Sequence, residues 1–367
     1  MTAHQSLIGL PKTALDTPAL LIDLDVMEAN IDRIAGECRR AGVRWRPHMK
    51  GVKTPEIVRK ELAAGAIGVT CAKLGEAEIM ARAGVRDILI ANQIVGRPKV
   101  HRLMALLDLA DVIVAVDSPD HVAELGDAAA NSGRRLRVVI EVNTGMNRAG
   151  VEPGAPAVAL AGAIAQHRGL RCAGLMAWES HAVAIADPAE KERTVAAAIA
   201  QLTASAAACR AAGHTVDIVS CGGTGTFPYC IRQPGVTEVQ VGGAILSDMH
   251  YRSHYHTDFP FALTVLATVT SRPTPTRIIL DAGRKTMSTE QAMPEPLGLP
   301  EVRRVKLSAE HATIELAAPS AQPRIGQTVE FVVGYSDTTV LLHEEIVGIR
   351  GGRIEAIWRV AARGKIK

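Results

Sequence analysis

Eight short apolar segments, separated by alanine-rich stretches, constrain the fold of this chain more than any other feature. The segments are Val43–Arg46, Ile67–Cys71, Asp87–Ala91, Val112–Val116, Leu136–Val142, Leu170–Ala177, Val216–Cys221 and Val239–Ala244. Most lack an apolar–polar alternation, as expected of strands covered on both faces. A doubly wound sheet is the competing architecture. The count of eight and the lack of a G-x-G-x-x-G turn favour a (β/α)8 TIM barrel, which we predict.

After about residue 255 the sequence pattern becomes that of short β-strands, and long helical patterns disappear. Its apolar pieces, joined by Pro and Gly turns, are Phe261–Thr270, Arg277–Leu280, Val302–Leu307, Ala312–Leu316, Thr328–Val333, Glu345–Arg350 and Arg353–Trp358. We therefore predict a barrel domain over residues 25–255 and an all-β domain formed by residues 1–24 and 256–367. The early strand Ala19–Ile22 is expected to join the all-β domain. A helix should follow it, with Asp25 as N-cap and Glu28 completing a capping box.

Composition and charge exclude several classes of partner. The chain has 367 residues and a formal net charge of +3, without a basic block, so we expect no nucleic acid. No apolar stretch reaches membrane-spanning length, and the first residues, M-T-A-H-Q-S-L-I-G-L, lack the pattern of a signal peptide. The six cysteines form no C-x-x-C pair. They fit buried, reduced thiols in a cytoplasmic protein.

Lys50 is the first candidate for chemistry, because it follows the first predicted barrel strand. Pro47 ends regular pairing of that strand, and a helix is expected from about Pro55. A lysine at the carboxyl end of a barrel strand is well placed for Schiff-base chemistry, since partial burial favours its neutral, nucleophilic amine. The alternative is an ordinary solvated loop lysine.

Two glycine-rich turns follow the last two predicted barrel strands. The first reads C-G-G-T-G-T over residues 221–226, and the second reads V-G-G-A over residues 241–244. Barrels commonly bind phosphate through backbone N–H groups at this place. The alternative is that these glycines only form tight turns. A lysine at one strand end and a phosphate cradle across the barrel mouth together suggest pyridoxal 5'-phosphate.

Several motifs carry a resemblance to a known enzyme family. They are R-P-H-M-K (Arg46–Lys50), N-T-G-M-N-R-A-G (Asn143–Gly150), C-G-G-T-G (Cys221–Gly225), Gly242-Gly243, D-A-G-R-K (Asp281–Lys285) and A-A-R-G-K (Ala361–Lys365). Over nearly its whole length the chain resembles the fold-type III pyridoxal-phosphate enzymes, in their D-threonine aldolase and D-serine dehydratase branch, which share the alanine racemase N-terminal domain.

The resemblance implies a set of cofactor-binding residues. Lys50 would carry the cofactor as a Schiff base, and Arg148 would contact its phenolate oxygen. Trp178 stands where relatives often have a tyrosine near the pyridine nitrogen; its indole N–H can only donate, so it would bond an unprotonated pyridine or simply pack. The remaining predicted cofactor contacts are His48, Gly223, Thr224, Gly225, Gly242 and Gly243.

The stretch G-Y-S-D-T-T, Gly334–Thr339, departs from the family pattern. Members usually carry a His-x-Cys or His-x-Asp metal pair there, whereas this chain keeps Asp337 and has Tyr335 at the histidine position. A neutral tyrosine is a poor ligand for borderline metals such as Zn²⁺. We predict a weak Mg²⁺ or Mn²⁺ site at Asp337, or none, and no tightly held zinc. Other nitrogen donors remain open, namely His343 or the cluster of His250, His254 and His256, which also fits a polar inter-domain linker.

The resemblance implies a lyase that cleaves small D-β-hydroxy amino acids by a retro-aldol reaction to glycine or a D-amino acid plus an aldehyde. His181, past the sixth strand, is the candidate base, and a structural histidine is the alternative. Other open activities are dehydration of D-serine or 3-hydroxy-D-aspartate by β-elimination, amino-acid racemisation, non-catalytic cofactor carriage, and sugar-phosphate chemistry in a metal-independent barrel. We expect a homodimer whose active site is covered by an all-β domain.

Overall fold

The structure is a computed structural model that describes residues 6–367, so residues 1–5 of the predicted all-β domain lie outside the described residues. It divides into two compact units. The barrel unit comprises Asp32–Lys50, Ile57–Gly242 and Gly364–Lys367. The β-rich unit comprises residues 6–31, Gly51–Glu56 and Gly243–Arg363.

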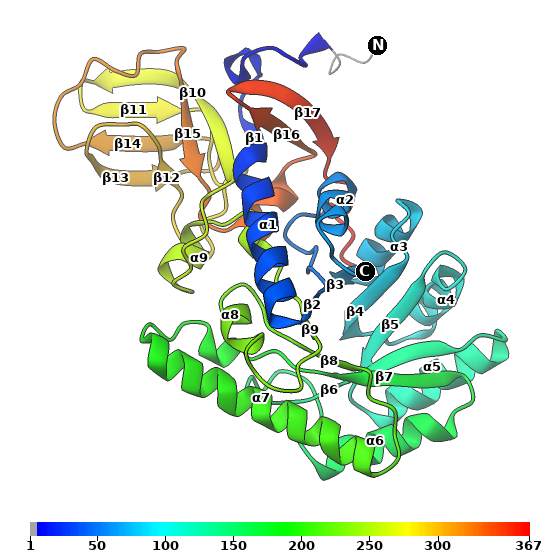
Figure 1. The fold of residues 1–367 in the computed structure, drawn as a ribbon. Helices are drawn as coiled ribbons and strands as arrows, with labels where there is room; N and C mark the ends of the chain where they lie inside the picture. The colour runs from blue at the N-terminus through cyan, green and yellow to red at the C-terminus, as the bar shows by residue number, and fades with distance from the viewer. Residues whose placement is uncertain (1–5) are drawn as a thin grey trace. The chain divides into compact units, whose positions relative to one another are not determined.

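An eight-stranded parallel sheet forms the centre of the barrel unit (Figure 1). In order around the sheet, its strands are β2 (Arg44–Trp45), β9 (Glu238–Val239), β8 (Ile218–Cys221), β7 (Leu170–Met176), β6 (Leu136–Glu141), β5 (Asp111–Val116), β4 (Asp87–Gln93) and β3 (Val69–Cys71). The two ends of this order are joined just beyond β2. There Thr70 N donates to the carbonyl oxygen of Pro47 at 2.8 Å, and Met49 N donates to that of Thr70 at 2.9 Å. The predicted barrel fold and its eight strands are confirmed.

Helices connect most of these strands. They are α2 (Pro55–Ala63), α3 (Leu74–Arg82), α4 (Arg97–Leu106), α5 (Pro119–Asn131), α6 (Ala155–Gln166) and α7 (Pro188–Ala211), and a short α8 (Phe227–Cys230) follows β8. In Figure 1, α3 to α7 lie along the outside of the strands. Local sequence sets their boundaries. At α5, for example, the Ser118 hydroxyl accepts the N–H of Asp120 at 3.0 Å and Pro119 occupies the first turn.

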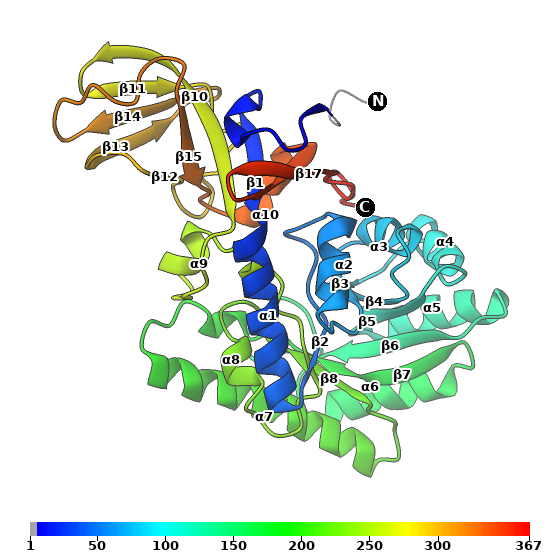
Figure 2. The ribbon, with the colours of Figure 1, turned by 45° about the horizontal axis from the view of Figure 1, so that its top comes forward.

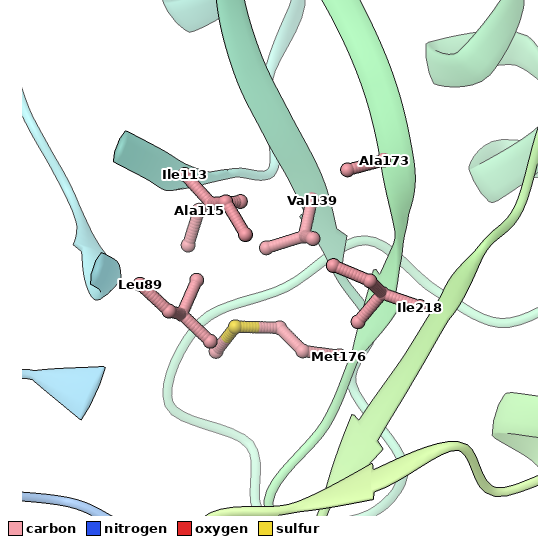
Figure 3. Packing of buried hydrophobic residues seen from close by; sticks show 7 residues of the cluster. All are labelled: Leu89, Ile113, Ala115, Val139, Ala173, Met176 and Ile218. Carbon is pink, nitrogen blue, oxygen red and sulfur yellow. The ribbon is translucent and has the colours of Figure 1, made fainter. Parts of the chain in front are cut away.

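Small aliphatic side chains build the core of the barrel unit. One cluster, drawn in Figure 3, consists of Leu89, Ile113, Ala115, Val139, Ala173, Met176 and Ile218. These residues come from five neighbouring strands, β4 to β8, and their side chains point toward one another. None is aromatic, which agrees with an aromatic content of only 3% for the whole chain. This cluster therefore consists of aliphatic side chains and one methionine.

A nine-stranded sheet dominates the β-rich unit. Its main path runs β13 (Val302–Leu307), β14 (Ala312–Leu316), β11 (Arg277–Leu280), β10 (Leu263–Thr274), β1 (Ala19–Asp23), β16 (Glu345–Arg350) and β17 (Arg353–Arg359). β15 (Thr328–Val332) pairs with β10, and β12 (Glu295–Pro296) pairs with β15. Figure 2 shows β10, β11, β13 and β14 side by side. β1 is antiparallel to β10 and parallel to β16, so the early strand joins this sheet as predicted.

The predicted start of the first helix is wrong by two residues. Helix α1 (Leu24–Ala41) begins directly after β1, and Asp23, rather than Asp25, accepts the N–H of Val26 at 3.0 Å. Asp25 and Glu28 instead form ion pairs with Arg350. Asp23 caps the helix because it is the last residue of β1 and therefore already has an extended backbone. The helix ends as predicted at Gly42, whose φ of +68° favours glycine.

Short helical turns complete the described chain. They are η2 (Lys12–Ala14), η3 (Ser180–Ala182), η4 (Gly243–Ile245), α9 (Met249–Ser253), α10 (Ser336–Thr339) and η5 (Val340–Leu342). Between residues 6 and 367, no helix has both the length and the apolar character that crossing a membrane requires.

Candidate active site

Lys50 lies at the carboxyl end of β2, partly exposed, as the sequence predicted. Its Nζ is 5.5 Å from the centre of the Trp178 ring, which follows β7. The chain between β2 and Lys50 is hydrogen-bonded to the segment after β9, since His48 N donates to the carbonyl oxygen of Gln240 at 3.1 Å. Nδ1 of His48 in turn accepts the backbone N–H of Lys50 at 3.4 Å. The lysine is therefore presented from a fixed backbone at the mouth of the barrel.

Arg148 reaches the same indole. Its guanidinium carbon is 5.5 Å from the centre of the Trp178 ring, and Nη2 is 3.9 Å from Oε1 of Glu141. Glu141 ends β6 and accepts a hydrogen bond from Nε2 of Gln93 at 2.6 Å. Burial raises the pKa of Glu141, against the opposing effects of Gln93 and Arg148. The structure thus brings together Lys50, Trp178 and Arg148, three of the predicted cofactor residues.

The glycine-rich turns after β8 and β9 are held side by side. Gln240 N donates to the carbonyl oxygens of both Cys221 and Gly222, each at 3.0 Å. Trp178 contacts the first turn, because a methyl group at Gly223 would lie 3.0 Å from its Nε1. In the described part of the chain, no hydrogen bond uses the N–H groups of Thr224, Gly225, Gly242 or Gly243. The turns therefore offer several backbone donors, as a phosphate group requires.

Gly242 also has a packing reason to be glycine. A methyl group at this position would lie 2.1 Å from the carbonyl oxygen of His48, closer than any real side chain approaches. The second predicted turn is therefore pressed against the chain that leads to Lys50. Both interpretations of this glycine, close packing and phosphate binding, are compatible with the geometry.

His181, the predicted base, is exposed and lies in η3, three residues after Trp178. Its imidazole lies against the loop that carries Arg148, since a methyl group at Gly145 would be 2.9 Å from Cε1 of His181. Gly145 has a φ of +122°, so this close approach also needs glycine. The structure keeps His181 as a candidate without showing a substrate contact.

Asp337 belongs to the β-rich unit and is held by two tyrosines. Its Oδ2 accepts the hydroxyl of Tyr335 at 3.1 Å, and its Oδ1 accepts that of Tyr251 at 3.3 Å. Burial and the charge of Asp337 raise the pKa of both tyrosines well above the ordinary value, so both act as neutral donors. A methyl group at Gly51, the residue after Lys50, would lie 2.6 Å from Oδ1 of Asp337. The carboxylate therefore lies against Gly51, which belongs to the same β-rich unit.

The alternative histidines differ in their surroundings. Nε2 of His343 lies 2.8 Å from the carbonyl oxygen of Thr286. His250 is buried and stacks on His254 with a centroid distance of 5.0 Å, and its ring meets Tyr335 edge-on at 5.1 Å. His256 is exposed, with a φ of +57°.

Comparison with known proteins agrees with this geometry. The family described as "Alanine racemase, N-terminal domain" matches residues 22–249, and the "Putative serine dehydratase domain" matches residues 262–349. The chain belongs to the alanine racemase N-terminal domain family. The predicted resemblance is thereby confirmed.

Its relatives within that family include aldolases. A D-threonine aldolase of Arthrobacter sp is 34% identical over 361 residues, which are 97% of this chain and 95% of the relative. A 3-hydroxy-D-aspartate aldolase of Paracoccus denitrificans is 30% identical over 370 residues, covering 98% and 95%. The crystal structure of D-threonine aldolase from Filomicrobium marinum matches with a TM-score of 0.93 and 36% identity, over 98% of this chain and 99% of that one. These relatives confirm the prediction of a pyridoxal-phosphate-dependent enzyme of the aldolase type.

Two buried acids, one in each unit, were not singled out from the sequence. Glu179, directly after Trp178, bonds Gly222 and Thr226 of the first glycine-rich turn. Asp248 precedes α9 and accepts the N–H groups of Tyr251 and Ser336, both at 2.7 Å, so it ties the two segments around Asp337 together. Burial raises the pKa of Asp248 to about 6. For Glu179 the signal was present, as an acid at the end of a barrel strand; Asp248 offered only its place before a short helix.

Proposed function

We propose that this chain is a pyridoxal-phosphate-dependent lyase that cleaves small D-β-hydroxy amino acids between Cα and Cβ, giving glycine or a D-amino acid and an aldehyde. The observation that carries this proposal is the position of the Lys50 amine, 5.5 Å from the Trp178 ring, at a strand end of the barrel unit that also carries two glycine-rich turns. The names of the relatives support the reaction type and the D configuration.

The residues present fit the cofactor. Lys50 would bind it covalently, Trp178 would pack against it, and Arg148 would face its phenolate oxygen. The N–H groups of residues 224, 225, 242 and 243 would hold its phosphate. The backbone of His48 supports the second turn, because it bonds Gln240 and packs against Gly242. When bound, pyridoxal phosphate supplies an electron sink for the pair released from the breaking Cα–Cβ bond.

We assign the proton transfer to His181. As the β-hydroxyl oxygen becomes the aldehyde oxygen, its proton must leave, and an imidazole nitrogen at the barrel mouth can accept it. Support comes from the exposure of His181 and from its contact with Gly145, in the loop that also carries Arg148. His181→Asn should then lower turnover while the absorbance of the bound cofactor stays the same.

The residues around Asp337 do not fit a tightly held metal ion. Both carboxylate oxygens already accept tyrosine hydroxyls, and a neutral phenol replaces the nitrogen donor of the family pattern. Among the described residues, no group of three potential ligand side chains within binding distance includes Asp337. We derive no step through a metal, and we propose that Mg²⁺ or Mn²⁺ binds Asp337 weakly if at all.

Three further features complete the proposal. We propose that residues 25–255 act as the cofactor domain and residues 1–24 and 256–367 as its β-rich companion. We also propose a homodimer, since a barrel mouth open to water would expose the bound cofactor to hydrolysis. The six free cysteines, five of them buried, support a cytoplasmic location.

The experiment that tests the function combines spectroscopy with a substrate panel. The purified protein should show an absorbance band of lysine-bound pyridoxal phosphate, and borohydride should fix the cofactor onto Lys50. Lys50→Ala should lose both properties. Aldehyde released from D-β-hydroxy amino acids supports the proposal, whereas ammonia without aldehyde would indicate the dehydratase alternative, the activity named in the description of the second matched domain.

A further inference from the structure

Glu179 is a fully buried carboxylate that lies at the end of β7 and is 0% exposed. Its Oε2 accepts the N–H of Gly222 at 3.4 Å. Its Oε1 accepts the hydroxyl of Thr226 and, at 3.3 Å, the thiol of Cys230. These donors come from both ends of the turn after β8 and from α8. One side chain therefore holds the whole glycine-rich turn.

Thr226 extends this network into the backbone of the turn. Its Oγ1 accepts the N–H of Gly223 at 3.1 Å while its hydroxyl donates to Glu179. The N–H groups of Gly222 and Gly223 are thereby used inside the protein. The next two, those of Thr224 and Gly225, have no acceptor among residues 6–367. The network thus separates the donors that shape the turn from the donors that remain for an anion.

The same acid could also be viewed as a metal ligand, because ligand atoms of Glu179, Cys221 and Cys230 lie within 4.8 Å of one another. Protonation argues against that view. Burial raises the pKa of the Cys230 thiol well above its ordinary value, so the thiol stays protonated and donates to Glu179. A metal would need the thiolate instead.

We propose that Glu179 is a positioning residue for phosphate binding. Through Gly222 and Thr226 it fixes the turn after β8, so that the N–H groups of Thr224 and Gly225 face the phosphate of the cofactor. The inference rests on the proposed function, because it takes the phosphate of pyridoxal phosphate as the ligand. Glu179 is not exposed, so it acts through the turn rather than by contact with the cofactor.

Glu179→Gln tests this role. Glutamine is neutral and has only one oxygen, so its hydrogen bonds to Gly222 and Thr226 lose the strength that a charged acceptor gives them. We expect affinity for pyridoxal phosphate to fall about 10- to 100-fold, the worth of a hydrogen bond to a charged group. Affinity for pyridoxal, which lacks the phosphate, should stay within about twofold. Both are measured by titrating full-length, cofactor-free protein and following the absorbance of the lysine-bound compound.

Two sets of controls separate positioning from general damage. Glu76 is equally buried, at 1% exposure, and accepts the N–H groups of Ala72 and Lys73 at 2.8 and 3.1 Å after β3. Glu76→Gln should therefore leave the ratio of the two affinities unchanged. Thr226→Val should reproduce the selective loss, and Thr226→Ser, which keeps the hydroxyl, should restore the wild-type ratio.

Each outcome bears on one proposal or the other. If the wild type forms no lysine-bound species with either compound, the proposed function fails. If it binds both, but Glu179→Gln weakens the two equally or weakens neither, the positioning role is overturned and the proposed function stands. If Glu179→Gln does not fold, the Thr226 pair decides. A selective loss in Thr226→Val alone supports the role, and equal losses for both compounds overturn it.

Discussion

Arg46 offers the sharpest test of how the barrel unit supports its lysine. The side chain is 2% exposed, and its Nε lies 3.0 Å from Oε1 of Glu238, which is 0% exposed. Its Nη1 lies 2.7 Å from Oδ1 of Asp87, a carboxylate that is 33% exposed. The guanidinium thus links β2 to β9 and β4 just four residues before Lys50. Of the two carboxylates, Glu238 depends more on the charge of Arg46, because it is fully buried whereas Asp87 is partly hydrated.

Replacing this arginine with methionine keeps an unbranched, apolar side chain in place of the aliphatic stem and removes the charged guanidinium. Glu238 would then be buried without its partner, and breaking a buried pair in this way costs about 3–5 kcal/mol. Asp87 adds little, since solvent can hydrate it. Against a typical total stability of about 5–15 kcal/mol, Arg46→Met should remove about a fifth or more of the free energy of unfolding.

Urea denaturation of wild type, Arg46→Met, Glu238→Gln and the double variant measures this directly. The double variant should recover much of the loss, because it removes the unpaired charge. A loss below about 1 kcal/mol, or a double variant no better than Arg46→Met, would refute the reasoning.

Two further expectations follow from the β-rich unit. Tyr335→His should raise the affinity for Mn²⁺ or Zn²⁺ at least about tenfold in calorimetric titration, because it restores a nitrogen donor beside Asp337; stoichiometric zinc retained by chelator-treated wild type would contradict this. Burial raises the pKa of Asp248 from 3.8 to about 6, so its contribution to stability is present below pH 4 and lost as the pH rises to 6. The change is on the order of 3 kcal/mol, and Asp248→Asn should abolish this pH dependence in denaturation measured between pH 4 and 7.

The strands could be predicted from the sequence because their pattern is local. A barrel strand covered on both faces reads as a short apolar run, and each run predicted here overlaps a strand of the sheet. The last run, Val239–Ala244, does so only at Val239, because a turn and η4 follow. β12 escaped prediction because two residues, Glu295 and Pro296, carry no periodic signal. The cap of α1 was misplaced because Asp23 and Asp25 are both plausible from spacing. Only the end of β1 decides between them.

The site residues divide in the same way. Lys50, Trp178 and Arg148 could be placed because each follows a predicted strand, and parallel strands bring their carboxyl ends to one mouth. The network around Glu179 could not, because its partners come from a turn and a short helix more than forty residues further along the chain. Likewise, no sequence pattern indicates that Tyr251 and Tyr335 occupy the two oxygens of Asp337.

Glycine shows why position and role must be tested separately. The sequence suggested that Gly242 binds phosphate, yet a side chain there would collide with the carbonyl oxygen of His48 at 2.1 Å. Gly242→Ala would therefore disturb the chain leading to Lys50 whether or not a phosphate binds, and its loss of activity would be uninformative. Thr226 has a side chain that can be changed without entering that contact, and its hydroxyl acts on one N–H of the turn. Comparing its Val and Ser variants therefore tests phosphate binding more cleanly than any glycine substitution in either turn.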